Sequence, residues 1–244
     1  MSQAADLVLT NAEVHTMGDP DETVEAVAIR DGRVVRVGRD YEIGFLVGVE
    51  TTVVDLEGRP LLPGFIDAHT HLPMLGRFAV HADLRGAPDL EACLDRLRAE
   101  RDGEGPILGY GFDETDWPTA RPPDRDDLDR VSTERAVIAF REDMHVAAVN
   151  SVALDRYRAD LPEADVEHED GRETGRLVEG AVEVLTAAVE PGPDGMRSLL
   201  VAAQSAALAR GVTAVHDMVR HSAAPRVYRQ LDLGGDLALR VRLN

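Results

Sequence analysis

The chain has 244 residues, of which 45 are acidic and 26 basic, so its formal net charge is −19. An acidic surface of this kind repels nucleic acid and anionic membranes, and it excludes a protein that binds either of them through a basic patch. Hydrophobic residues make up 44% of the chain, which is enough for a core and excludes a disordered protein. The length fits one large domain, or one domain with a smaller one.

The composition also indicates a compartment. The sequence contains no Lys, and halophilic proteins use such an acidic excess to stay soluble, so a high-salt cytoplasm is predicted; a mesophilic acidic protein is the alternative. Cys93 is the one cysteine, which excludes an internal disulfide. The start, MSQAADLVLT, has no basic segment and no long apolar run, and no apolar stretch approaches membrane-spanning length. A cytoplasmic protein is therefore expected.

Residues 1–60 are expected to form a small all-β domain. The segments that indicate it are rich in Val, Ile and Thr and are interrupted by turn residues: LVLTNAEVHTM, AVAIRDGRVVRVG and TTVVDLEGRPLL. In the second segment, Asp31-Gly32 can supply the positive φ angles of a tight turn. AVAIRDGRVVRV is therefore predicted to be a β-hairpin.

Strand and helix patterns alternate over residues 61–244. Strands are expected at LLPGFIDAH (61–69), PILGYGF (106–112), AVIAFRE (136–142), GVTAVHDM (211–218) and LALRVRL (237–243). Helices are expected near 88–101, 149–157, 176–189, 193–210 and 223–233, and the acidic stretch 159–175 is expected to be a loop. The alternation predicts parallel βαβ units. Because a closed (β/α)8 barrel needs about eight strands, these five indicate either a smaller open sheet or an incomplete barrel.

The stretch PGFIDAHTHL (63–72) carries the first chemical signal. His69 and His71 lie two positions apart in a strand, so their side chains project from the same face. They follow the strand at its C-terminal end, the edge at which parallel α/β folds bind ligands. Two neutral imidazoles there suit zinc, iron or manganese, and Asp67 could orient one of them. A hydrogen-bonded histidine pair without metal is the alternative, because His-x-His alone is weak evidence.

The order of these segments resembles the amidohydrolase superfamily of metal-dependent hydrolases. Within it, the sequence is similar to amidohydrolase family 3, a branch that includes N-substituted formamide deformylases and relatives of exoenzyme regulatory proteins. The similar segments are DLEGRPLLPGFIDAHTHL (55–72), residues 109–154, TGRLVE (174–179) and GVTAVHDM (211–218). The resemblance implies a small β domain, sandwich-like, at 1–60, followed at 61–244 by the N-terminal part of a (β/α)8 TIM-type barrel with about five strands.

The resemblance also implies roles for particular residues. His69 and His71 match the family's metal-binding pair. Glu179 matches a glutamate that could bridge two metal ions in place of a carboxylated lysine, although a helical Glu is usually solvated. Arg141, Asp143 and His145 match an Arg-x-Asp-x-His run, and we expect them to contact substrate; an Arg–Asp ion pair that holds a strand end is the alternative.

Two further polar residues have simpler interpretations. Asn150 matches an Asn that opens a helix in the family, and capping alone would explain it. His216 ends the strand GVTAVH and is expected to be a packed histidine.

For function, the resemblance implies a hydrolase acting on a non-peptide carbon–nitrogen bond in a small amide, formamide or cyclic amide. Water activated by one or two divalent ions, with zinc as the first candidate, would be the nucleophile. Proteins of this branch are about twice as long, and their general base comes from the last barrel strand, so no catalytic residue is assigned within these 244 residues. The alternative is a non-catalytic product of a truncated or split gene. Its partner would be a complementary C-terminal chain, or a second copy in a homo-oligomer.

Overall fold

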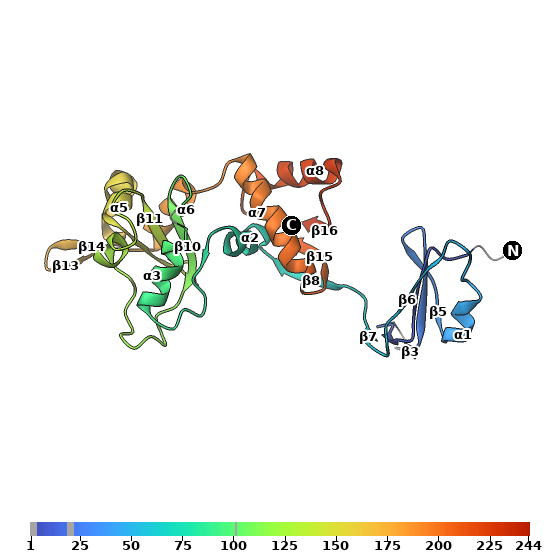
Figure 1. Cartoon of the computed structure of the whole chain (residues 1–244). Coiled ribbons are helices and arrows are strands. Elements are labelled where there is room, and N and C mark those ends of the chain that lie inside the picture. The colour runs from blue at the N-terminus through green and yellow to red at the C-terminus, as the bar shows by residue number, and fades with distance from the viewer. Residues whose placement is uncertain (1–3, 19–21, 101) are drawn as a thin grey trace. The chain divides into compact units, whose positions relative to one another are not determined.

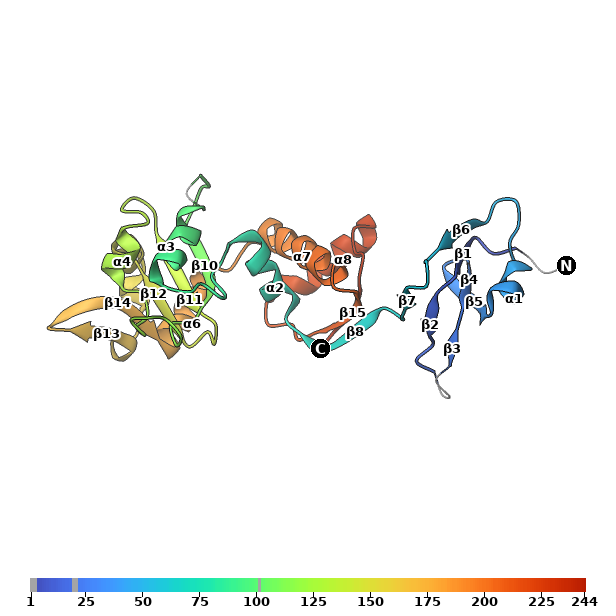
Figure 2. The same cartoon turned by 60° about the horizontal axis from the view of Figure 1, so that its bottom comes forward.

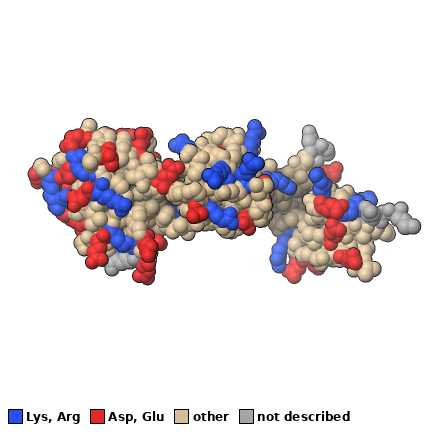
Figure 3. Space-filling view, turned by 90° about the horizontal axis from the view of Figure 1, so that it is seen from above, with Lys and Arg blue, Asp and Glu red and all other residues tan. Residues whose placement is uncertain are grey.

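A computed structural model describes residues 4–18, 22–100 and 102–244 (Figure 1). Its internal contacts divide the chain into two compact units, Met1–Phe65 and Ile66–Asn244. Acidic and basic side chains lie interspersed on the surface (Figure 3). Within the described ranges, every helix is too short or too polar to cross a bilayer.

The first unit is a pair of small sheets. A four-stranded sheet has the order β5-β4-β1-β6, and a three-stranded sheet has the order β3-β2-β7. The elements are β1 (Leu7–Thr10), β2 (Glu13–His15), β3 (Thr23–Val24), β4 (Ala26–Arg30), β5 (Arg33–Gly38), α1 (Asp40–Gly44), β6 (Thr52–Asp55) and β7 (Pro60–Leu61). The predicted hairpin is confirmed: β4 and β5 are antiparallel, and Asp31 and Gly32 have φ angles of 51° and 70°.

The first sheet of the second unit contains the predicted histidine strand. Its order is β16-β15-β8, formed by β8 (Phe65–Thr70), β15 (Val212–Asp217) and β16 (Arg240–Leu243), and β15 and β16 are parallel. Three helices pack beside it: α2 (Leu72–Val80), α7 (Pro193–Leu208) and α8 (Ala224–Gly234) (Figures 1 and 2). A Cβ atom on Gly76 would lie 2.2 Å from the carbonyl oxygen of Leu199, so α2 and α7 touch backbone to backbone.

The second sheet is built from residues between α2 and α7. Its six strands have the order β13-β14-β12-β11-β10-β9. They are β9 (Ala82–Asp83), β10 (Ile107–Phe112), β11 (Val137–Arg141), β12 (Val146–Val149), β13 (Val166–Glu169) and β14 (Arg172–Val178). Strands β9, β10 and β11 are parallel, whereas β12, β13 and β14 join by antiparallel pairing.

Alternation along these strands gives the second sheet a core on each face. Ile138 and Phe140 pack on one side with Val182 of α6 (Glu179–Ala188), and Val137 and Ala139 pack on the other with residues of α3 (Leu90–Arg98). The remaining helices are α4 (Arg125–Asp129), α5 (Ser151–Tyr157) and the 3₁₀ turns η1 (Arg158–Asp160) and η2 (Glu163–Asp165).

The mixed α/β class is confirmed, but the strand arrangement differs from the expectation. All five strands expected after residue 61 are present, as β8, β10, β11, β15 and β16. The expectation that they form one parallel series is wrong, because β10 and β11 belong to the six-stranded sheet and β8, β15 and β16 to the other. Alternating strand and helix patterns do not reveal which strands pair, and the antiparallel β12 and β14 were not recognised.

The expected loop at 159–175 is also corrected. It contains β13 and the start of β14, joined at Asp170-Gly171, whose φ angles are 51° and 77°. The strand β14 continues to Val178, so α6 begins at Glu179 rather than at residue 176. The hairpin is solvated, with Glu167, His168 and Glu169 exposed, which explains the missing hydrophobic period.

Candidate metal and substrate site

His71 lies between β8 and α2, and its ring is held by a backbone carbonyl. The distance from its Nδ1 to the carbonyl oxygen of Met218 is 2.9 Å. A carbonyl oxygen only accepts, so Nδ1 donates, and in the neutral ring the lone pair is then on Nε2. Metal-binding histidines in proteins commonly donate their second ring nitrogen in this way. This bond leaves His71 Nε2, one of the two ring nitrogens through which histidine binds metals, with its lone pair free.

His69 completes the pair that the sequence indicated. The two ring centroids are 5.7 Å apart and the rings are nearly perpendicular, at 89°. With a metal–nitrogen distance of about 2.1 Å, two imidazoles on one tetrahedral ion have centroids about 5 Å apart. The pair thus fits a divalent ion with a small adjustment. Asp67 does not reach either ring through a hydrogen bond recorded in the structure; its Oδ1 accepts from the His69 N–H at 3.0 Å.

Within the described residues, the structure places no complete set of metal ligands around His69 and His71. No group of three or more His, Cys, Asp or Glu side chains is arranged there to hold a metal ion. A catalytic zinc ion in proteins normally has three protein ligands and an open position. His69 and His71 are therefore two candidate ligands that need at least one more.

Arg141 is the last residue of β11, Asp143 lies in the turn that follows it, and the two form an ion pair. The Arg141 guanidinium also contacts Glu114, from Nε to Oε2 at 3.0 Å, and the Asp143 Oδ1 accepts from the His145 N–H at 2.9 Å. Partial burial opposes ionisation of Asp143, but the His145 N–H and Arg141 outweigh it and lower the pKa of Asp143. The ion pair expected as an alternative is thus present. A role in binding substrate stays a prediction.

His145 and Glu179 form a second pair. His145 Nδ1 lies 3.1 Å from Glu179 Oε2, and the Glu179 N–H donates to the His145 carbonyl oxygen at 3.1 Å. The hydrogen bond and charge of Glu179 raise the pKa of His145. Glu179 has a φ angle of 44° and Met144 one of 63°, both in the left-handed region that non-glycine residues rarely adopt. Because Glu179 contacts His145 here, its role as a metal ligand stays a prediction.

Two adjoining hollows lie beside the candidate site residues. The larger, of about 460 Å³, is lined by Asp143, His145 and Glu179 together with residues of α2 and α6. The smaller, of about 80 Å³, is lined by His71 and Met218. Met74, Arg220 and His221 line both hollows. His71 from one predicted group and Asp143, His145 and Glu179 from the others therefore border adjoining hollows, whereas His69 and Arg141 line neither.

Arg77 of α2 also lines the larger hollow, and no motif in the sequence indicated it. It is 2% exposed, its guanidinium lies 5.2 Å from the centre of the Tyr110 ring, and Nη1 and Nη2 have no hydrogen-bond partner among the described residues. Burial is the main cause of a lowered pKa of His81, and the positive charge of Arg77 lowers that pKa further.

Asn150 is the helix cap that was predicted: its Oδ1 accepts from the Ala153 N–H at 2.9 Å.

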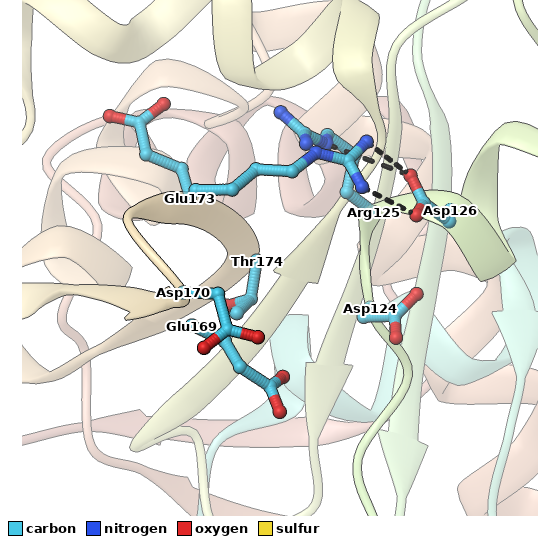
Figure 4. A pocket seen from close by; sticks show the side chains of 8 residues that line it. Asp124, Arg125, Asp126, Glu169, Asp170, Glu173 and Thr174 are labelled. Atoms are coloured by element: carbon cyan, nitrogen blue, oxygen red, sulfur yellow. Dashed lines mark hydrogen bonds and ion pairs between the residues drawn. The ribbon is translucent and has the colours of Figure 1, made fainter.

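A third hollow, of about 350 Å³, is bordered by β13, β14 and α4 (Figure 4). Its charged residues pair with one another, as where Arg172 donates to the two carboxylate oxygens of Asp126 at 2.8 and 2.7 Å. Its lining residues are Asp124, Arg125, Asp126, Glu169, Asp170, Arg172, Glu173 and Thr174. This set contains no imidazole or thiol, so the hollow does not fit a zinc site.

Comparison with known proteins identifies the family. A sequence model described as "Amidohydrolase family" matches residues 52–244. The chain belongs to the amidohydrolase family. It is 28% identical over 253 residues to an N-substituted formamide deformylase of Arthrobacter pascens, covering 97% of this chain and 47% of that protein. It is 33% identical over 228 residues to protein LONG AFTER FAR-RED 3 of Arabidopsis thaliana, covering 89% of this chain and 39% of that protein.

A solved structure agrees with this assignment. An uncharacterized metal-dependent hydrolase from Pyrococcus horikoshii superposes with a TM-score of 0.76 at 27% identity, over 97% of this chain and 48% of the other. The predicted resemblance to the amidohydrolases is thus confirmed. The chain spans about half the length of these proteins, or less.

Proposed function

We propose that this chain is the N-terminal portion of a metal-dependent amidohydrolase that hydrolyses a non-peptide carbon–nitrogen bond in an amide, a formamide or a cyclic amide. The observation that carries the proposal is the pair His69–His71 at the end of β8, with ring centroids 5.7 Å apart and His71 Nδ1 bonded to Met218. Membership of the amidohydrolase family and the likeness to a metal-dependent hydrolase support it.

His69 and His71 would hold a divalent ion, with zinc as the first candidate for one or two ions. Such an ion supplies Lewis acidity, which polarises a carbonyl group and lowers the pKa of water. Glu179 would serve as a further ligand, which requires its hydrogen bond to His145 to open. The open bond would leave His145 free to face the substrate.

Asp143 and His145 are suited to bind an amide. The lowered pKa of Asp143 favours its carboxylate, an acceptor for an amide N–H. The His145 ring, once released by Glu179, can donate an N–H to a carbonyl oxygen. Arg141 holds Asp143 in place through their ion pair. These three residues would orient the substrate beside the metal.

Further strands would complete the barrel. Ile66 of β8 is 66% exposed, and in the described part of the chain no strand pairs with the edge of β8 opposite β15. A sheet edge left open in this way favours association with another strand. We propose that a continuation of this chain, a complementary C-terminal chain or a second copy covers it and supplies the general base. The acidic composition without Lys supports a high-salt cytoplasm as the setting.

Metal analysis of the complete protein tests the proposal. The double variant His69→Ala/His71→Ala should lose bound zinc and the hydrolysis of a panel of small amides and formamides. His168→Ala is the matched control, because His168 lies in β13 and lines neither of the two adjoining hollows. Full zinc occupancy in the double variant would refute the metal assignment.

The intact mass of the protein from its source cells distinguishes the hydrolase from a non-catalytic product. A mass near 26.5 kDa with no co-purifying chain and no amide hydrolysis would overturn the proposal. A mass about twice as large, the size expected for a barrel with an additional domain, would support it.

A further inference from the structure

We propose that Asp217 is a positioning residue for His71, and this inference rests on the proposed role of His71 as a metal ligand. Asp217 is the last residue of β15 and is 0% exposed. Its Oδ1 accepts from the Leu72 N–H at 3.0 Å, and its Oδ2 accepts from the Tyr228 hydroxyl at 2.6 Å. A carboxylate is almost never fully buried unless its oxygens are satisfied, and here both oxygens have a donor.

Asp217 acts together with its neighbour Met218. The Met218 N–H donates to the Thr70 carbonyl oxygen at 2.8 Å, and the Met218 carbonyl oxygen accepts from His71 Nδ1. Two consecutive residues of one segment therefore hold three consecutive residues of another, Thr70, His71 and Leu72. The two segments are about 145 residues apart in the chain.

His71 needs such support because it lies outside regular structure. Its φ of −118° and ψ of 82° belong to neither strand nor helix, and as the residue that precedes α2 it makes no side-chain capping bond. The Leu72 N–H, one of the unpaired donors at the start of a helix, is satisfied by Asp217 instead. The negative charge of Asp217 at this end also suits the helix dipole of α2. Asp217 thereby fixes the backbone that follows His71, while Met218 fixes its ring.

Tyr228 supports Asp217 from α8. Its ring packs in the apolar core formed by α2, α7, α8 and the sheet, and its hydroxyl donates the hydrogen bond that satisfies Asp217 Oδ2 there. This arrangement predicts how conservative changes behave. Asn at position 217 can still accept from Leu72 through its carbonyl oxygen and can donate to the Tyr228 oxygen, because a hydroxyl also accepts.

Zinc affinity of the complete protein, measured by competition with a chelator, tests the inference. Asp217→Ala should weaken zinc binding by about 10–100-fold, the usual effect of removing a group that orients a metal ligand. Asp217→Asn should restore affinity to within about threefold of the original protein, roughly half a pKd unit or less. With Co²⁺ in place of zinc, Asp217→Ala should also change the visible absorption spectrum, because that spectrum reports ligand geometry.

Asp129→Ala is the matched control. Asp129 accepts from the Ser151 N–H at 2.9 Å and from the Ser151 hydroxyl at 2.7 Å, so it too bonds the first residue of a helix. It lines neither the hollow that His71 borders nor the larger one beside it. Its loss should lower stability without weakening zinc binding. If Asp217→Ala and Asp129→Ala weaken zinc binding equally, Asp217 has only a structural role and the inference fails.

The outcomes separate this inference from the proposed function. If His69→Ala/His71→Ala loses zinc while Asp217→Ala binds it as tightly as the original protein, the metal site stands and the role of Asp217 is refuted. If the double histidine variant keeps its zinc, the proposed function fails first. Should Asp217→Ala not fold, Tyr228→Phe decides: a loss of affinity above about threefold supports the inference, and unchanged affinity overturns it.

Discussion

Asn150 provides the sharpest test of how the six-stranded sheet is held together. Its side chain is 0% exposed and makes four hydrogen bonds. The Oδ1 atom accepts from the N–H groups of Val137 and Ala153 at 3.0 and 2.9 Å. The Nδ2 atom donates to the carbonyl oxygens of Ser132 and Arg135 at 2.7 and 2.9 Å. Asn150 therefore joins β11, the start of α5 and the segment before β11.

The stability that Asn150 contributes can be worked out from these four hydrogen bonds. A hydrogen bond contributes a net stabilisation of about 0.5–1.5 kcal/mol, so four bonds give about 2–6 kcal/mol. A helix cap alone contributes about 1 kcal/mol. We expect Asn150→Ala to lower the free energy of unfolding by ~4 kcal/mol, because the buried groups that it bonds lose their partner. The change should exceed that of a simple cap several-fold.

Denaturation in urea, followed by the fluorescence of Trp117, measures the effect, because this single tryptophan packs in the same cluster as Val137. Asp89→Ala is the control: Asp89 caps α3 with one bond, to the Ala92 N–H at 2.8 Å, and its loss should cost about 1 kcal/mol. Equal costs for the two variants would refute the reasoning. If Asn150→Ala kept full stability but abolished amide hydrolysis, the interpretation as a structural residue would be wrong.

Three further predictions concern Gly76, Cys93 and His81. In urea denaturation, Gly76→Ala should lower the free energy of unfolding by about 1–3 kcal/mol or more, because its Cβ would lie 2.2 Å from a backbone oxygen of α7. Gly192→Ala is the control: its Cβ would have no atom within 4 Å, so it should cost about 1 kcal/mol or less. Burial raises the pKa of Cys93 to about 12, so a thiol reagent should modify it slowly in the native protein and quickly in denaturant; fast native modification would contradict this. Burial, and to a smaller extent the charge of Arg77, lower the pKa of His81 in the folded protein. The His81 ring therefore binds a proton more readily in the unfolded chain. The free energy of unfolding should thus fall as the pH drops below about 6.5, the usual pKa of His. His81→Gln should reduce that fall, and an unchanged pH profile would show that His81 does not cause it.

Local signals in the sequence predicted those features that depend only on residues close together in the chain. The Asp31-Gly32 turn predicted its hairpin because a two-residue turn with positive φ angles is a local requirement. The spacing of His69 and His71 predicted that the two side chains lie close together, and their ring centroids are 5.7 Å apart, although His71 follows the end of β8. The order of the motifs indicated the amidohydrolase family, which the family match over 52–244 confirms.

Some elements were not predicted from the sequence because their hydrophobic pattern is weak or short. The hairpin of β13 and β14 has exposed polar residues, so it lacks the alternation that marks a half-buried strand, although Asp170-Gly171 carried the same turn signal as Asp31-Gly32. The short helix α2 directly follows His71 with a Pro at its second position and was not expected either. These elements are defined by packing against distant segments more than by their own pattern.

The sequence by itself determined the five strands expected after residue 61, the hairpin at residue 31, the histidine pair and the family. Periodicity, turn chemistry and motif order are properties of neighbouring residues. Only the tertiary structure decided that β10 and β11 lie in a different sheet from β8, that Glu179 contacts His145, and that Asp217 and Met218 hold His71. Hydrogen bonds join residues up to 148 positions apart, as between Met218 and Thr70. Such contacts follow from the packing of whole layers, which no short stretch of sequence specifies.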